Sequence, residues 1–380
     1  MINKKRLTAL TQKLIGINSE NPPGREWDIA EFIRKDMLSL GLDVKTYTFQ
    51  KKRPNIVATL RGKLPRKVAS SQAILLSPHI DTVPAGKGWR FGPFSGKIHQ
   101  GKIYGRGASD DKGNLACCME VLRSLMEDGV SFQKDIIMAA TADEETGSHF
   151  GIVPLLAKKI LKPKAALIMD SDEFHSIIAQ KGLIHCRVQI FGKKAHGAYN
   201  WRGINAIEQA GRIINQIKQH KFSFKKHTLL HAPTVNVGTI KGGDKVNMVA
   251  DFCEFSLDFR YLPGTDPKSV LNILKKTIRS EAKKFKIIID DLQYPYEIDT
   301  DHSLVKTFSA TCKKMGFKSQ LTGSEGATVI SFFKRFGIPA IATGFAAEGT
   351  AHITDEYAVV NDLYHGSQVL EQFLKDYDQI

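Results

Sequence analysis

The sequence predicts an α/β protein in which a small domain is inserted into a larger one. Residues 1–181 alternate segments of helical periodicity with short apolar runs, an order typical of a three-layer αβα domain on a mostly parallel sheet. Residues 182–292 instead follow the order strand, helix, strand, strand, helix, strand, which is the ferredoxin-like α+β pattern. The first kind of alternation resumes in residues 293–380, which are therefore expected to complete the larger domain.

Each expected element rests on a local pattern. Apolar periodicity predicts helices in the larger domain at 7–17, 29–40, 112–127, 303–315, 328–336 and from 363 onward. The second of these helices ends at Gly41, a residue type typical of a helix C-terminus. Short apolar runs predict its buried strands: 55–60, 73–77, 136–141, 165–169 and 340–343. The inserted domain is expected to have strands at 185–191, 234–240, 254–262 and 287–291 and helices at 204–219 and 266–285. Residues 63–71 are expected to form a polar loop.

Composition limits the classes of function. The net charge is +15, and residues 182–292 hold 19 Lys and Arg against 9 Asp and Glu, so +10 of it lies there. These cations are not interleaved with aromatic residues, which favours a solvated basic surface or attraction of acidic substrates over a nucleic-acid partner. No apolar run is long enough to cross a membrane, so no membrane association is expected. Five cysteines without paired spacing indicate free thiols and a cytoplasmic location.

Polar residues with metal-binding chemistry follow the first expected strands. His79 and Asp81 come after residues 73–77, and side chains two apart on a strand project to one face. Asp110 and Asp111 lie in the glycine-rich segment GRGASDDKG, whose glycines permit a tight approach of backbone and carboxylate to a metal. Each pair also has a purely structural interpretation, as polar residues at a strand end or as a helix N-cap.

The later strands end in the same way. Glu144 and Glu145 follow residues 136–141, Asp170 ends the run 165–169, and His352 lies beyond the strand expected at 340–343. A surface acidic turn is the alternative for the glutamate pair taken alone. Because ligands of open α/β sheets gather at one edge, the joint pattern predicts a pair of divalent metal ions and metal-assisted hydrolysis. The intact set argues against a binding protein with a degenerate site.

Together these motifs resemble the dinuclear zinc hydrolase family of acetylornithine deacetylase, succinyl-diaminopimelate desuccinylase and carboxypeptidase G. The resemblance covers essentially the whole chain. It implies hydrolysis of an amide bond in a small N-acyl amino acid or short peptide, with a dipeptidase or carboxypeptidase activity as the alternative. It also implies two Zn²⁺ ions, for which Co²⁺ or Mn²⁺ could substitute.

The resemblance assigns roles to the motif residues. Asp110 would bridge the two ions, and the Asp110–Asp111 bond would be cis. The other ligands would be His79 and Asp170 at one ion, and Glu145 and His352 at the other. Glu144 would activate a zinc-bridging water as the general acid/base, and Asp81 would hold the second ring nitrogen of His79.

In the inserted domain the resemblance implies contacts to the substrate. His196 would stabilise an oxyanion, across the subunit interface of a homodimer formed through this domain, and Asn247 and Arg260 would contact the substrate. An ion pair with Asp258 is the alternative for Arg260. Two departures concern the substrate: Asp170 stands where deacylase members usually carry glutamate, and Ser324–Ala327 replaces a glycine-rich Thr-Asp segment. Glu325 would then face the pocket, where it could receive a cationic group.

Overall fold

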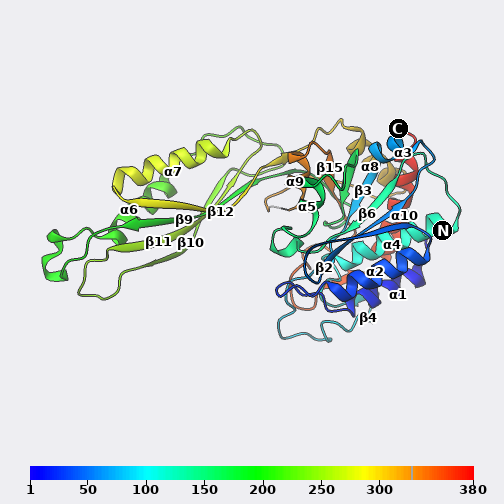
Figure 1. Cartoon of the computed structure of the whole chain (residues 1–380), viewed down its shortest axis with the longest axis horizontal. Coiled ribbons are helices and arrows are strands. Elements are labelled where there is room, and N and C mark those ends of the chain that lie inside the picture. Colours follow the sequence, from blue (N-terminus) through cyan, green and yellow to red (C-terminus); the bar gives the residue numbers. More distant parts are fainter. Residues whose placement is uncertain (327) are drawn as a thin grey trace. The chain divides into compact units, whose positions relative to one another are not determined.

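The computed structural model describes residues 1–326 and 328–380, and the chain divides into two units (Figure 1). The first unit consists of Met1–Ile178, Ile298–Thr322 and Phe332–Ile380. The second unit consists of Ala179–Glu297 and Gly323–Ser331. An inserted domain at residues 182–292 was the prediction, and the structure places its limits a few residues further out. It also adds the separate segment Gly323–Ser331, which the order of sequence elements gave no reason to expect.

The first unit is built on a sheet whose central strands are buried along their whole length. These are β6 (Ile136–Ala140), β3 (Ile74–Ser77) and β7 (Ala165–Ile168), which are paired in parallel in that order. Complete burial explains why their sequences are continuous apolar runs without alternation. On one side β2 (Arg53–Leu60) and β1 (Asp43–Gln50) continue the sheet antiparallel. On the other, β15 (Ala340–Ala342) pairs parallel with β7, and β8 (Ser176–Gln180) pairs antiparallel with β15.

Helix α4 (Lys112–Glu127) is buried along most of its length. It begins and ends where its sequence predicted, and most of its residues are buried on every side. Two other helices pack against it, α1 (Lys4–Ile15) and α10 (Val360–Asp378), and α10 also packs on α8 (Ser303–Lys314). A helix buried all round needs apolar residues beyond one stripe, which explains the weakly amphipathic sequence of α4.

The remaining elements of the first unit are short, apart from α2 (Trp27–Ser39), which packs on β1 and β2. They are α3 (Arg66–Ser71), α5 (Ile152–Ala157), the 3-10 turn η1 (Glu144–Thr146), and the small sheet of β4 (Lys97–His99), β5 (Lys102–Tyr104) and β16 (Tyr357–Val359). The polar loop predicted for residues 63–71 is wrong, because Pro65 precedes a six-residue helix there. Strand β14 (Leu321–Ser324) pairs with β8 at the end of the main sheet.

The second unit has the predicted ferredoxin-like order. Its elements are β9 (Gly182–Phe191), α6 (Ala206–Gln219), β10 (Thr234–Gly242), β11 (Phe252–Tyr261), α7 (Pro267–Glu281) and β12 (Phe285–Gln293), followed by the short β13 (Tyr296–Glu297), which pairs with β8. The four long strands form an antiparallel sheet in the order β10-β11-β9-β12, and α6 and α7 pack side by side (Figure 1). Alternate residues of β9 and β11 face a core shared with both helices, as period-two burial requires.

The fold class predicted from the sequence is therefore confirmed, with an antiparallel edge on each side of a parallel centre. The helix predicted at 328–336 is present as α9 (Ile330–Arg335). Ala327, the last residue of the Ser324–Ala327 departure, lies outside the described residues. Among the helices that the structure describes, none is long and apolar enough to cross a membrane.

Candidate metal centre

His79 and Asp81 leave the first unit's sheet at the end of β3. The backbone of His79 bridges to Thr141 beyond β6, so the segment continues the direction of the strand. The His79 Nδ1 atom lies 3.0 Å from the Asp81 carbonyl oxygen and 3.5 Å from the Asp81 carboxylate. The opposite ring nitrogen, Nε2, lies 2.7 Å from Asp110 Oδ1. Asp81 therefore holds one side of a buried imidazole and turns the other side toward Asp110.

Asp110 and Asp111 share the loop between β5 and α4. Gly107 has φ +86°, and a Cβ there would lie 2.8 Å from the Thr82 side chain, so glycine is required at this turn. The Asp110–Asp111 peptide bond is cis, as predicted. The buried Asp111 carboxylate accepts the backbone N–H of His79 at 3.0 Å and the Asn114 amide at 2.8 Å. Asp111 thus fixes the position of the His79 backbone, while the Asp110 side chain faces His79 Nε2.

Glu144 and Glu145 occupy the 3-10 turn η1 after β6. Their backbone N–H groups donate to the two oxygens of Asp81, at 3.0 Å and 3.1 Å. Glu145 Oε1 also accepts the backbone N–H of Val83 at 3.2 Å. Because one buried carboxylate contacts both the His79 ring and this turn, Asp81 ties the imidazole to the glutamate pair.

His352 completes the group from the loop before β16. Its Nε2 atom lies 3.0 Å from Asp110 Oδ2 and 3.1 Å from Glu145 Oε2. The ligand atoms of His79, Asp110 and Glu145 lie within 4.8 Å of one another. Asp170 follows β7, the strand beside β3, and the negative charge of Asp110 contributes to a raised pKa of Asp170. The structure therefore brings together four of the five residues for which metal ligation was predicted, namely His79, Asp110, Glu145 and His352, and ligation by Asp170 stays a prediction.

The electrostatics of the centre show an excess of buried negative charge. Burial raises the pKa of Glu144 well above its usual range and the pKa of Asp170 to about 7, and neighbouring carboxylates add to both shifts. Hydrogen bonds to Asp110 and Glu145 raise the pKa of His352 to about 10. Burial opposes protonation of His79, yet the bonds to Asp110 and Asp81 raise its pKa well above 6.5. Without another cation, protons have to neutralise these carboxylates.

The donor set fits divalent metal ions. Two ligand atoms on one tetrahedral zinc ion, each about 2.0–2.1 Å from it, are separated by roughly 3.3 Å. The distances from His352 Nε2 to Asp110 and Glu145 are close to this value. The two oxygens of Asp110 face different imidazoles, Oδ1 toward His79 and Oδ2 toward His352. A carboxylate in this position is able to serve two ions, one on each side.

Comparison with known proteins decides the family. Residues 75–376 match the model of peptidase family M20/M25/M40. The chain belongs to this family. The family is metal-dependent. Its members are peptidases and deacetylases, so the protein is a hydrolase that acts on amide bonds.

Individual M20 relatives agree with this assignment. The chain is 29% identical to acetylornithine deacetylase of Photorhabdus laumondii over 331 residues, which is 84% of this chain and 82% of the relative. Its fold is similar to that of aminopeptidase PepT from Bacillus cereus, with a TM-score of 0.82, 21% identity and 99% of each chain covered. A dinuclear metal-binding M20 peptidase from Bacillus subtilis has a TM-score of 0.74 at 15% identity, over 98% of this chain and 97% of the other.

The four remaining predicted residues all belong to the second unit. His196 is exposed, and its Nδ1 accepts the backbone N–H of Ala198 at 3.1 Å, which leaves the proton on Nε2 when the ring is neutral. Asn247 is exposed, and its backbone carbonyl accepts the N–H of Gly197 at 2.8 Å. Arg260 donates to Asp258 at 2.7 Å and 3.1 Å, which is the ion pair considered as the alternative.

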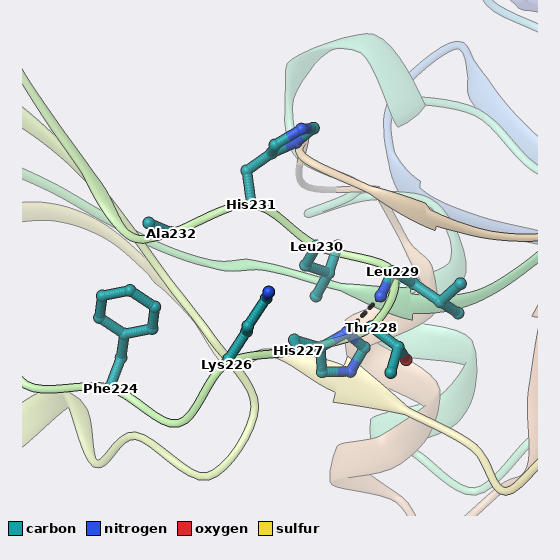
Figure 2. Close-up of a pocket in the computed structure, with 8 residues that line it drawn as sticks. All are labelled: Phe224, Lys226, His227, Thr228, Leu229, Leu230, His231 and Ala232. Carbon is teal, nitrogen blue, oxygen red and sulfur yellow. Dashed lines mark hydrogen bonds between the residues drawn. The ribbon is translucent and has the colours of Figure 1, made fainter.

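Glu325 is also engaged within the second unit. Its carboxylate lies 2.5 Å from Lys181 Nζ and accepts the backbone N–H of His231 at 2.9 Å. His231 also lines a hollow of about 610 Å³ formed by Phe224 and residues 226–232 (Figure 2). There the backbone N–H of Leu229 donates to His227 Nδ1 at 3.0 Å, the bond drawn in Figure 2. The hollow lies outside the metal centre, which belongs to the first unit.

Several residues that hold the centre together were not identified from the sequence. Asn21 donates to Asp81 at 2.8 Å, and Arg53 lies 2.9 Å from the carboxylate of Asp143, the residue that begins the Glu144 turn. Arg106 and Glu356 form a buried ion pair behind Asp110. None of them shows a metal-binding spacing. The available signal was limited to Arg53 and Arg106, which are charged residues beside an apolar and a glycine-rich stretch.

Proposed function

We propose that this protein is a zinc-dependent hydrolase that removes the acyl group from a small N-acyl amino acid, or cleaves a short peptide. The observation that carries the proposal is the position of Asp110 between two imidazoles, with one carboxylate oxygen facing each. His79 and Asp170 would complete one metal site, and Glu145 and His352 the other. Co²⁺ or Mn²⁺ could occupy the same oxygen and nitrogen ligands.

The chemistry assigned to the protein side chains centres on Glu144. Divalent ions bound here would polarise the scissile carbonyl and make a water molecule easier to deprotonate. Glu144 would accept a proton from the attacking water and deliver it to the leaving nitrogen, for which a raised carboxyl pKa is suitable. Asp81 would keep the catalytic turn in place, since it binds the backbone N–H of Glu144 and the ring of His79.

The second unit would supply substrate contacts. His196 carries a donor on Nε2 that could stabilise a developing oxyanion, and we propose that it does so across a homodimer formed through this unit. Asn247 and the guanidinium N–H groups of Arg260 not used by Asp258 would bind the substrate carboxylate. Glu325 carries no part of this proposal, because its carboxylate already binds Lys181.

A dipeptidase or carboxypeptidase-type activity is the second candidate. The aminopeptidase-like fold and the aspartate at position 170 favour it, whereas the relative at 29% identity is a deacetylase. The five cysteines are all buried and free, which agrees with the cytoplasmic location that we propose.

The decisive experiment is a substrate screen with metal reconstitution. Protein stripped of metal by a chelator should be inactive and should regain turnover with Zn²⁺, Co²⁺ or Mn²⁺. N-acetyl amino acids, N-succinyl amino acids and dipeptides, tested in parallel, distinguish the two candidates. Turnover that survives complete removal of metal would refute the proposed function.

A further inference from the structure

A buried ion pair connects the segment of Asp110 to the segment of His352. Glu356 Oε1 accepts the backbone N–H of Ser109 at 2.8 Å and of Asp110 at 3.0 Å. Its other oxygen accepts a hydrogen bond from Arg106 Nη1 at 2.5 Å. The side chains of Arg106 and Glu356 are 3% and 0% exposed. The backbone on which the Asp110 side chain stands is therefore fixed by a carboxylate from the other end of the chain.

The guanidinium of Arg106 contacts the loop of His352 directly and also reaches the loop of Ala85. Its Nη2 atom donates to the carbonyl of His352 at 3.3 Å and to that of Ala85 at 3.5 Å. The cation also lies over the ring of Trp89, 5.2 Å from the ring centre. The Arg106–Glu356 pair thus contacts the loops that carry Asp110 and His352. Among the described residues, these hydrogen bonds reach the backbone of the two loops and none of the proposed metal-ligating atoms.

Stability alone does not account for a pair of this kind. Two charges removed from water lose hydration that their mutual attraction only partly restores, so apolar residues of similar size often serve as well. What the pair does specify is geometry, since one carboxylate accepts two consecutive N–H groups and one planar guanidinium spans two loops. Such an arrangement fixes the distance between Asp110 Oδ2 and His352 Nε2, now 3.0 Å.

We propose that Arg106 and Glu356 are positioning residues that set the affinity of the metal site formed by Asp110, Glu145 and His352. The inference rests on the metal ligation proposed above. Two of the three loops that would bind this ion are held by the pair, whereas the site of His79 and Asp170 shares only Asp110 with it. Loss of the Arg106–Glu356 pair should therefore lower the metal affinity of this site more than that of the site of His79 and Asp170.

The test compares Glu356→Gln with Glu120→Gln. Glu120 is also a buried carboxylate that binds an arginine and a backbone N–H, but its partners are Arg6 and Asn3. Zinc is titrated into chelator-stripped full-length protein by calorimetry, and the melting temperature of the metal-free protein is recorded. A His352→Ala protein identifies which binding event belongs to the site under test.

Glu356→Gln should weaken that event about tenfold to a hundredfold, the range for partners that orient metal ligands. The other event should change by less than about threefold, and Glu120→Gln should leave both unchanged at a comparable loss of melting temperature. Equal affinities in Glu356→Gln and the wild type would overturn the proposal. If Glu356→Gln does not fold, Arg106→Lys, which keeps the charge but loses the planar fork, provides the same comparison. A wild-type protein that binds no zinc would instead refute the proposed function.

Discussion

Replacing Lys112 by methionine tests whether a buried cation next to the metal centre limits stability at neutral pH. The Lys112 side chain is fully buried at the start of α4, and its Nζ donates to the carbonyl of Ile17 at 2.7 Å. Burial lowers the pKa of Lys112 from 10.5 to about 7, although Glu356 and Glu20 act in the opposite direction. Methionine keeps the length and apolar character of the side chain without the charge.

The size of the effect follows from the two pKa values. Below about pH 7, Lys112 is protonated in the folded and the unfolded chain, so folding carries the full cost of burying the cation. Between about pH 7 and 10.5 the unfolded chain binds more protons, so the free energy of unfolding rises with pH by up to about 1.4 kcal/mol per pH unit. From pH 7 to pH 9 the free energy of unfolding of the wild type should rise by about 2–3 kcal/mol more than that of Lys112→Met.

The assay is denaturant unfolding of metal-free protein at pH 7 and pH 9. Lys112→Met also loses the hydrogen bond to Ile17, which lowers its free energy of unfolding by about 1–3 kcal/mol at both pH values. Only the difference between the values at pH 7 and pH 9 is therefore diagnostic. Lys313→Met, at an exposed position of α8, is the control and should follow the wild type. If the free energy of unfolding changes between pH 7 and pH 9 by the same amount in Lys112→Met and the wild type, within about 0.5 kcal/mol, Lys112 does not titrate in this range and the reasoning is refuted.

Three further outcomes are expected. Glu144→Gln should lower kcat by about 10²–10⁴-fold at unchanged metal content, because an acid/base group is lost; steady-state rates within tenfold of the wild type would contradict this role. Asp143→Asn should lower the free energy of unfolding by about 1–3 kcal/mol in a denaturant titration, because it removes the charged acceptor of Arg53 Nη1 while Glu26 still pairs with the rest of the guanidinium; no measurable loss would show that the charge of Asp143 does not stabilise this turn. His196→Ala should lower kcat more than it raises KM, since an oxyanion donor acts in the transition state; an effect on KM alone would assign His196 to ground-state binding.

The buried elements of the fold were predictable because burial leaves a strong pattern in the sequence. Helix α4 and the strands β3, β6 and β7 consist of uninterrupted apolar or helix-forming residues, and they were found to within one or two residues. Strand β1, at the edge of the sheet, was missed. Its sequence DVKTYTFQ is polar and half-exposed, so neither an apolar run nor a clear alternation marks it.

The candidate site was predictable to the extent that strand ends determine it. His79, Glu145 and Asp170 follow three neighbouring strands, and parallel strands bring such positions to one edge of the sheet. The Arg106–Glu356 pair could not be found in this way, because its partners are 250 residues apart and bind backbone N–H groups. Backbone contacts leave no signature in residue type at the position that is held.

Glu325 has a partner that the departure in its segment did not suggest. In the sequence it is an acid where the resembling family has a different segment, which suggested a substrate with a cationic group. In the structure Lys181 is 1% exposed, and a buried ammonium of this kind requires an anionic partner, which Glu325 provides at 2.5 Å. The cation that Glu325 binds thus comes from the chain itself. The sequence did contain a signal for this contact. Lys181 directly follows the apolar run of β8, and a lysine buried there needs a carboxylate from another part of the chain to neutralise its charge. The departure at Asp170, which is a proposed metal ligand, is therefore the one that bears on the choice between deacylase and peptidase.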